Sequence, residues 1–507
     1  MNGPMGDLSK RTVKASAWTA GARVAAKALD LAALIVLARY LRSDDFGLVA
    51  MAMTLIFIVE AIVEIPHYGA MLRVAHPTPN LYNTAFTLGL LRGLLIAGFF
   101  AAGALPLSHL YNEPRLVLLV MSLALAPAMR GCASPRMVEY SRRMDFRRQA
   151  WLDIVSKFIA LTAAVTTAIL TRSYWSIAIG TILAPLVGLV GSYVLAPMRP
   201  RLTLKEWPVF ANLLTWNLFS QLITAVNWQV ERLVLPRFIA PDVFGRFALA
   251  KDLSDLPFQV LAAPLAPPLN VAFVSANQNG DVGRTYRRAS GAVFLVIAPA
   301  LCFGAILSEP LIRVFLGTHW LEAAPILSGL ALGGLASVPG QPMVALAVSL
   351  NQSQKVTSRN LAALAVHVPA TIMGIVTMGV MGAVIARGLT AFTTFVSTML
   401  AVRSMTGLSL RAQLGVLAAP FVALAISCFA LFSMASMLHG DTEIASLLPK
   451  LVVIGMVYLS VYVAAVYGMT LWLGDVIGVT SLLPKVWLSR PGGAEKHPLR
   501  LMGRLLK

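Results

Sequence analysis

The chain of 507 residues is 58% hydrophobic and only 12% charged, and its mean hydropathy is +0.76. Because soluble globular proteins carry about 25% charged residues, this composition excludes an ordinary soluble protein. The net charge of +19 would suggest nucleic-acid binding in a soluble chain. Here apolar runs of about 20 residues, long enough to cross a bilayer, recur along the chain. We therefore expect a polytopic membrane protein and no nucleic-acid partner.

We expect an all-α protein with about 14 transmembrane helices, because the apolar runs are too long and uniform for β-barrel strands. In chain order they cover residues 16–40, 46–66, 84–106, 115–137, 151–171, 174–197, 209–235, 244–272, 289–308, 323–350, 360–380, 382–402, 413–436 and 447–472. The eighth helix contains Pro257, Pro264, Pro267 and Pro268, which predict a bend or a break. The predicted units are two six-helix lobes, two additional helices and a basic cytoplasmic tail, at residues 1–205, 206–405, 406–475 and 476–507.

The segments outside the predicted helices fall into two alternating sets, one on each side of the membrane. The set that includes the N-terminal segment carries about four times as many Lys and Arg residues as the other set. This bias predicts that both termini are cytoplasmic. No small-residue cleavage site follows a short apolar core, so we expect no removable signal peptide. Cys132, Cys302 and Cys428 lie in apolar segments without metal-ligand spacing, and we expect no metal and no cofactor.

An internal repeat appears when the chain is shifted by 198 residues, the spacing between Trp18 and Trp216. The first copy of the repeat contains Arg39-Tyr40, Asp44, Phe46-Gly47, Ala50 and Ala52. The second copy has Arg237-Phe238, Asp242, Phe244-Gly245, Ala248 and Ala250 at the matching positions. Because the shift spans six helices, the two halves share one orientation and are expected to face each other around a central cavity. Asp44 and Asp242 are interpreted as helix N-terminal caps. An acidic extracytoplasmic loop of a membrane glycosyltransferase is the alternative.

Charged residues inside membrane spans usually face a bundle interior or a water-filled cavity. The first helix places Arg23, Lys27 and Asp30 on one face. The second carries Glu60 and Glu64, one turn apart. The seventh has a polar stripe of Asn217, Ser220, Gln221, Thr224, Trp228 and Glu231, with Arg232 beside it. Two local ion pairs are indicated by a spacing of four residues: one between Asp153 and Lys157, the other between Lys251 and Asp255. We expect the stripes of helices one and seven to line the cavity.

Cations on several spans favour an anionic substrate such as a diphosphate, and tryptophan faces near the stripes suit sugar rings. The candidate substrate-binding residues are Arg23, Lys27, Asn217, Gln221, Trp228 and Arg232. Four acids without an obvious partner are candidates for binding a coupling ion, either a proton or sodium: Asp30, Glu60, Glu64 and Glu231. No catalytic residue is predicted.

The first hairpin reads Trp18-Thr-Ala-Gly followed by Val36-Leu-Ala-Arg-Tyr-Leu-Arg-Ser-Asp-Asp-Phe-Gly-Leu-Val-Ala-Met-Ala. This pattern resembles the polysaccharide-transporter (Wzx-like) family of the MOP flippase superfamily, which also contains MATE multidrug extruders and the peptidoglycan lipid flippase. Phe315-Leu-Gly-Thr-His-Trp-Leu-Glu-Ala-Ala-Pro-Ile-Leu is similar to the segment before the tenth helix of that family.

The resemblance implies a transporter and not an enzyme. By alternating access it would move a polyprenyl-diphosphate-linked oligosaccharide across the bacterial inner membrane, for exopolysaccharide, capsule or O-antigen synthesis. Its expected partners are the lipid-linked oligosaccharide, membrane lipids and the polysaccharide polymerase machinery. The cationic cavity of the family agrees with Arg23 and Lys27. Glu231-Arg232 departs from the expected apolar run with a single acid, which puts ion coupling there in doubt.

Two other functions stay open. A MATE-like drug or cation antiporter is expected to have a mainly acidic cavity, whereas the spans of this chain carry many cations. A membrane glycosyltransferase or polymerase is expected to have a large extracytoplasmic loop, and the sequence contains no polar stretch of that length.

Overall fold

A computed structural model describes residues 4–63, 70–72, 74, 76–143, 145–211, 215–438 and 444–473, and in this part of the chain the secondary structure is helical, as predicted. The helices of the first half are α1 Pro4–Tyr40, α2 Ser43–Ile62, α4 Pro79–Tyr111, α5 Leu116–Leu123, α6 Leu125–Gly131, α7 Val138–Arg142, α8 Arg147–Thr171, α9 Trp175–Leu195 and α10 Trp207–Ala211. By "first half" and "second half" we mean the described residues of 4–211 and 215–406.

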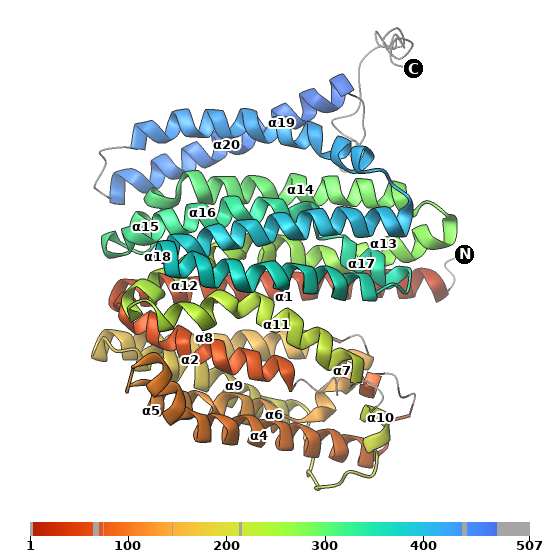
Figure 1. Ribbon diagram of the computed structural model, residues 1–507. Coiled ribbons are helices and arrows are strands. Elements are labelled where there is room, and N and C mark those ends of the chain that lie inside the picture. Colours follow the sequence, from red (N-terminus) through yellow and green to blue (C-terminus); the bar gives the residue numbers. More distant parts are fainter. Residues whose placement is uncertain are drawn as a thin grey trace.

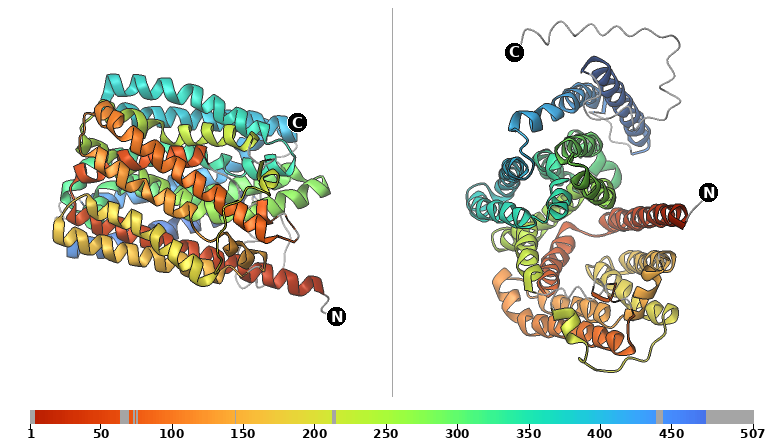
Figure 2. Two further views of the ribbon diagram at one scale, coloured as in Figure 1. Left: turned by 90° about the horizontal axis from the view of Figure 1, so that it is seen from below. Right: turned by 90° about the vertical axis from the view of Figure 1, so that its right-hand side faces the viewer.

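The second half contains α11 Thr215–Val234, α12 Pro241–Pro257, α13 Ala266–Asn279, α14 Val282–Ile306, α15 Ser308–Phe315, α16 Ala324–Gly334, α17 Met343–Ser349 and α18 Gln354–Thr406. Short non-α turns join some of them: η2 Leu235–Arg237, η3 Phe258–Ala262, η4 Ala263–Leu265, η5 Thr318–Ala323 and η6 Leu335–Gly340. The last two helices, α19 Leu410–Ala435 and α20 Ile444–Leu473, pack on each other and on α14 (Figure 1). Tyr458 and Tyr462 of α20 donate hydrogen bonds to the α14 backbone. The end-on view in Figure 2 shows that the axes of most of the long helices lie roughly parallel to one another.

Nine helices among the described residues are long and apolar enough to cross a membrane, or ten if the bent pair Leu116–Gly131 and Pro135–Arg142 forms one span. The protein is therefore a multi-pass membrane protein, but this criterion does not confirm the predicted number of 14. Helix α1 is not among the nine, since Arg23, Lys27 and Asp30 make its centre too polar. The number of spans and the orientation of the termini stay predictions.

Two helices depart from regular geometry where the sequence suggests it. After Pro257 the α-helix gives way to a π-helical turn and then a 3-10 turn before α13 begins, which confirms the predicted break. Helix α18 turns back on itself at Gly379, whose φ of 59° is readily adopted only by glycine. A Cβ atom on Gly382 would lie 1.8 Å from the Gly374 carbonyl oxygen, so the two arms meet backbone to backbone.

The repeated Phe-Gly patterns of the two halves contact each other where α2 packs on α12. A Cβ atom added to Gly47 would lie 1.9 Å from the Pro241 oxygen, and one added to Gly245 would lie 1.8 Å from the Ser43 oxygen. Each glycine also faces the backbone nitrogen of the other. We call this arrangement the paired-glycine contact. Only residues without a side chain allow the two helices to approach this closely.

Further contacts between the halves surround the paired-glycine contact. The Trp320 indole donates a hydrogen bond of 2.8 Å to the Ala38 oxygen, and its ring packs edge-to-face on Phe46 with centroids 5.2 Å apart. Arg39 donates to the carbonyl oxygens of Phe315 and Val314. A buried apolar cluster that includes residues of both halves continues inward from these bonds. One end of the molecule is thus held together by backbone, aromatic and hydrogen-bond contacts.

The predicted capping roles of Asp44 and Asp242 are wrong, although both carboxylates do lie in the first turn of their helices. The capping carboxylate of α2 is Asp45, which accepts from the Arg42 backbone N–H at 3.2 Å and from Tyr174 N–H at 3.1 Å. Asp44 instead pairs with Arg42 and Arg115. Asp242 does not cap α12, because the N-cap residue is Ala240; its carboxylate pairs with Arg246 at 3.5 Å.

Acids that lack a partner along the sequence are paired across helices. Asp30 on α1 contacts Lys27 at 3.3 Å and also Lys157 on α8, so the predicted Asp153–Lys157 pair is not the ion pair that Lys157 forms. Glu60 on α2 contacts Arg130 on α6 at 2.8 Å. The interpretation of Asp30 and Glu60 as acids without partners is therefore wrong. The predicted pair of Lys251 and Asp255 is confirmed at 3.1 Å, and Glu64 lies outside the described residues.

The paired-glycine contact predicts that Gly47→Ala and Gly245→Ala each destabilise the protein by about 1–3 kcal/mol, since the added methyl overlaps backbone that cannot move aside easily. Thermal unfolding of the detergent-purified protein measures this. Gly98→Ala is the matched control, because Gly98 on α4 has no atom within 4 Å of an added Cβ. Unchanged melting temperatures for both variants would contradict the contact.

The Glu60–Arg130 pair predicts that Arg130→Gln lowers the free energy of unfolding by on the order of 1 kcal/mol, because it leaves a mostly buried carboxylate without its partner. The double variant Glu60→Gln, Arg130→Gln should recover part of that loss in chemical unfolding experiments. Arg284→Gln, which removes a pair whose side chains are 61% and 48% exposed, serves as the control with little effect. Equal stability of Arg130→Gln and the wild type would refute the structural role of the pair.

Candidate functional site

A polar cavity of about 550 Å³ lies within the second half of the chain. Its lining residues run from Thr224 to Thr398 and come from the helices α11 to α14 and α16 to α18 and from the turns between them. The broken segment after Pro257 forms part of the wall. Cavities of about 300–1,000 Å³ are typical of small-molecule sites, so this space suits a headgroup or a few sugar rings.

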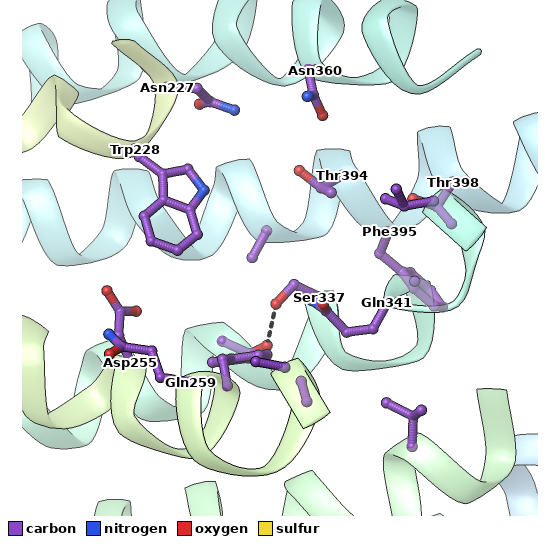
Figure 3. A pocket seen from close by; sticks show the side chains of 18 of the residues that line it. Asn227, Trp228, Asp255, Gln259, Ser337, Gln341, Asn360, Thr394, Phe395 and Thr398 are labelled. Atoms are coloured by element: carbon purple, nitrogen blue, oxygen red, sulfur yellow. Dashed lines mark hydrogen bonds between the residues drawn. The ribbon is translucent and has the colours of Figure 1, made fainter. Parts of the chain in front are cut away.

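Hydrogen-bonding groups and aromatic rings surround the space. The lining amides are Asn227, Gln259, Asn270, Gln341 and Asn360; the hydroxyls are Thr224, Ser254, Ser337, Thr390, Thr394 and Thr398; the aromatic rings are Trp228, Phe258 and Phe395. In Figure 3, Asn227 and Asn360 lie on one side and Gln259 and Gln341 on the other, with Trp228 between them. Trp228 is 53% exposed, so its ring face is available to a ligand.

The charged groups that line the cavity are Lys251, Arg359, Arg387 and Asp255. Lys251 is neutralised by Asp255 at 3.1 Å. Arg359 donates to the Asn360 amide oxygen at 2.8 Å and, within the described part of the chain, forms no ion pair with a carboxylate. A guanidinium held in this way in a low-dielectric region attracts an anion strongly. The cavity is therefore polar and positively charged.

A buried ionic cluster lies behind the cavity wall. Glu231 on α11 and His367 on α18 are both fully buried, and Glu231 Oε1 lies 3.0 Å from His367 Nε2. His367 Nδ1 lies 2.9 Å from the Asn227 amide oxygen. Arg387, whose side chain is 25% exposed and lines the cavity, lies 3.6 Å from the same Glu231 oxygen. Arg387 and Asn227 thus connect the buried acid to the cavity.

The predicted site residues are only partly brought together. Trp228 lines the cavity, whereas Arg232 is buried and bonds to Asp252 and to the Ala248 oxygen. Asn217 and Gln221 belong to α11, but their side chains lie outside the described residues. Neither Arg23, which is exposed on α1, nor Lys27 is a lining residue of this cavity. The roles of these residues in substrate binding stay proposals.

Several lining residues were not predicted from the sequence, chiefly those of η6 and α18. Thr390, Thr394 and Thr398 recur every four residues and so form one polar stripe along the second arm of α18. His367 and Asn360 interrupt an apolar run in the first arm. These spacings could have identified the lining residues from the sequence, because polar residues that repeat at helical intervals inside a span indicate a face turned away from lipid.

Comparison with known proteins places the chain in a family. Residues 36–325, more than half of the chain, match the family described as "Polysaccharide biosynthesis protein". The succinoglycan biosynthesis transport protein ExoT of Rhizobium meliloti (strain 1021) is 24% identical over 329 residues, which cover 64% of this chain and 66% of that protein. The lipopolysaccharide biosynthesis protein WzxC of Escherichia coli (strain K12) is 22% identical over 349 residues, 67% of this chain and 70% of that protein.

The chain thus spans about two thirds of the length of these relatives. A solved structure of the lipid II flippase MurJ has the same fold, with a TM-score of 0.69 and 13% sequence identity over 92% of this chain and 100% of that chain. The name of ExoT states transport, which agrees with the prediction of a transporter-type protein and not an enzyme. The chain belongs to the polysaccharide biosynthesis protein family, as its resemblance to Wzx-like transporters predicts.

Proposed function

We propose that the protein is a flippase that moves a polyprenyl-diphosphate-linked oligosaccharide across the bacterial inner membrane, for the synthesis of exopolysaccharide, capsule or O-antigen. The names of its relatives, which concern succinoglycan and lipopolysaccharide biosynthesis, support this class of cargo. The observation that carries the proposal is the polar, positively charged cavity inside an otherwise apolar membrane protein.

In this proposal the cavity holds the charged and polar part of the cargo while the prenyl chain stays in the lipid. Arg359, which forms no ion pair with a carboxylate among the described residues, binds the diphosphate. The amides and hydroxyls of the wall replace the water that hydrates the sugars, and Trp228 stacks on a sugar ring. Removing sugars from water without such partners would cost several kcal/mol for each lost group.

Residues outside this cavity complete the proposed path. Arg23 on α1 is exposed, and Lys27 on the same face is held by Asp30 at 3.3 Å. We propose that these cations guide the diphosphate from the first half, and that Asn217 and Gln221 extend the polar face of α11 toward it. The two six-helix lobes would form the two sides of this path.

The proposed transport cycle is alternating access. The paired-glycine contact and the Trp320 and Arg39 hydrogen bonds join the two halves at one end of the molecule. Opening that end requires these contacts to separate while the opposite ends of the halves approach each other. Backbone contacts between glycines suit such a cycle because no interlocked side chains have to be pulled apart.

The sign of the cavity charge argues against a drug or cation antiporter of the same superfamily. A cationic drug inside the membrane needs carboxylates near it, whereas Asp255 is paired with Lys251 and Arg359 is left over. We place the protein in the inner membrane with both termini in the cytoplasm, where polysaccharide polymerase machinery would receive its product on the outer side.

Arg359→Gln should weaken the binding of farnesyl diphosphate, a soluble polyprenyl diphosphate, by about tenfold or more, since a hydrogen bond to a charged group contributes about 1.5–3 kcal/mol. Isothermal titration calorimetry on the purified protein measures this affinity. Arg403→Gln is the matched control, because Arg403 is an exposed arginine on the same helix and does not line the cavity. Equal affinities of Arg359→Gln and the wild type would remove Arg359 from the proposed site.

Deletion of the gene should cause lipid-linked oligosaccharide to accumulate in the cytoplasmic leaflet, because its synthesis continues while its transfer stops. Mass spectrometry of extracted lipids, combined with a membrane-impermeant enzyme that cleaves only outward-facing sugars, detects this pool. Unchanged glycolipids together with raised sensitivity to cationic drugs would overturn the proposal in favour of an antiporter.

A further inference from the structure

The buried contact between Glu231 and His367 requires a proton. The Asn227 amide oxygen only accepts hydrogen bonds, so the His367 Nδ1 that lies 2.9 Å from it must donate. The other ring nitrogen, Nε2, then faces Glu231 Oε1 at 3.0 Å. Without a proton between them, a nitrogen lone pair and a carboxylate would repel each other at this distance. One proton shared by the two groups turns this repulsion into attraction.

Arg387 competes with that proton for the same carboxylate oxygen. Its guanidinium lies 3.6 Å from Glu231 Oε1, and the arginine also lines the cavity. Within the described residues, Glu231 Oε2 has no hydrogen-bond partner. His367 and Arg387 therefore both act on the same oxygen, Oε1, and a weaker contact with one of them makes the carboxylate depend more on the other.

We infer that Glu231 and His367 form a proton-binding site and that Arg387 couples this site to an anion in the cavity. An anion that enters the cavity attracts Arg387 away from Glu231. The negative charge of the Glu231 carboxylate is then balanced mainly by the shared proton, so the pair holds that proton more tightly. By linkage, the protonated protein binds the anion more tightly than the deprotonated one. This inference rests on the proposed function, since it assumes an anionic cargo.

The surrounding charges leave Glu231 dependent on these two partners. From α12, Lys251 acts on Glu231 electrostatically but is neutralised by Asp255 at 3.1 Å. On α11 itself, the neighbouring Arg232 is engaged by Asp252. Helix α2, which also packs on α11, carries Glu60, and Arg130 holds that acid at 2.8 Å.

The same arrangement speaks against sodium at Glu231. A sodium ion needs several oxygen ligands around it, whereas the carboxylate is surrounded by an imidazole and a guanidinium. Both of these groups are donors toward the acid. The fully buried position of Glu231 and His367 therefore suits a proton, which needs only the two atoms it joins.

The test measures farnesyl diphosphate affinity by calorimetry against pH for the wild type, Glu231→Gln and Asp252→Asn. In the wild type, the affinity should fall by about tenfold per pH unit as pH rises through the range in which the shared proton is lost. Glu231→Gln should show only the shallower slope that comes from the probe's own phosphates. Asp252→Asn is the control: it removes a different acid, which pairs with Arg232 of α11, and it should keep the wild-type slope.

Equal slopes in the wild type and Glu231→Gln would overturn the inference while leaving the proposed function intact. Absence of farnesyl diphosphate binding by the wild type at every pH would overturn both. If Glu231→Gln does not fold, His367→Asn takes its place. Proton uptake on binding is then also counted in the wild type from calorimetry in two buffers of different ionisation enthalpy. Uptake no larger than that of the probe alone would refute the coupling.

Discussion

The hydrocarbon of a bilayer cannot solvate an isolated charge, and this constraint explains most of the polar structure of the protein. Several of the described acids inside the helical bundle have a cation from another helix against them. Asp30 joins α1 to α8, Glu60 joins α2 to α6, and Asp252 joins α12 to α11. These pairs hold the helices in register, where packing of apolar side chains alone would allow them to slide.

Arg359 is the informative departure from this rule. Its guanidinium lines a polar cavity and donates to two neutral groups, the Asn360 amide oxygen and the Met343 sulfur. The guanidinium lines the cavity, where an anion can take the place of a carboxylate. Arg387 is intermediate, since it touches both the cavity and the buried Glu231. These two arginines give the second half of the chain a capacity for anions.

The repeated sequence pattern has a structural meaning that its residues alone do not reveal. Phe46-Gly47 and Phe244-Gly245 were recognisable as copies, but a repeat does not state that its two copies contact each other. The structure places the two glycines against each other's backbone at the end where α2 and α12 begin. A duplicated element that meets its own copy produces a symmetric joint, which is a suitable arrangement for two halves that move as rigid bodies.

The helical fold was predictable because long apolar runs leave little choice of structure in a membrane. The ion pairs were not, since Lys157 is far from Asp30 in sequence while Asp153 has the correct local spacing. Most of the second-half cavity was also not predictable: the sequence suggests a space shared by both halves, and of its predicted substrate-binding residues Trp228 lines this cavity. Single polar residues such as Ser337 and Gln341 carry no periodic signal until the helices are placed side by side.

The most direct test of the central claim is transport by the purified protein in liposomes. A polyprenyl-diphosphate-linked oligosaccharide with a fluorescent sugar is placed in both leaflets, and a membrane-impermeant quencher reports the fraction that becomes accessible over time. The wild type is expected to bring the inner pool to the outer leaflet, and Arg359→Gln is expected to slow this transfer strongly. Transfer by the folded wild type no faster than in empty liposomes would contradict this expectation.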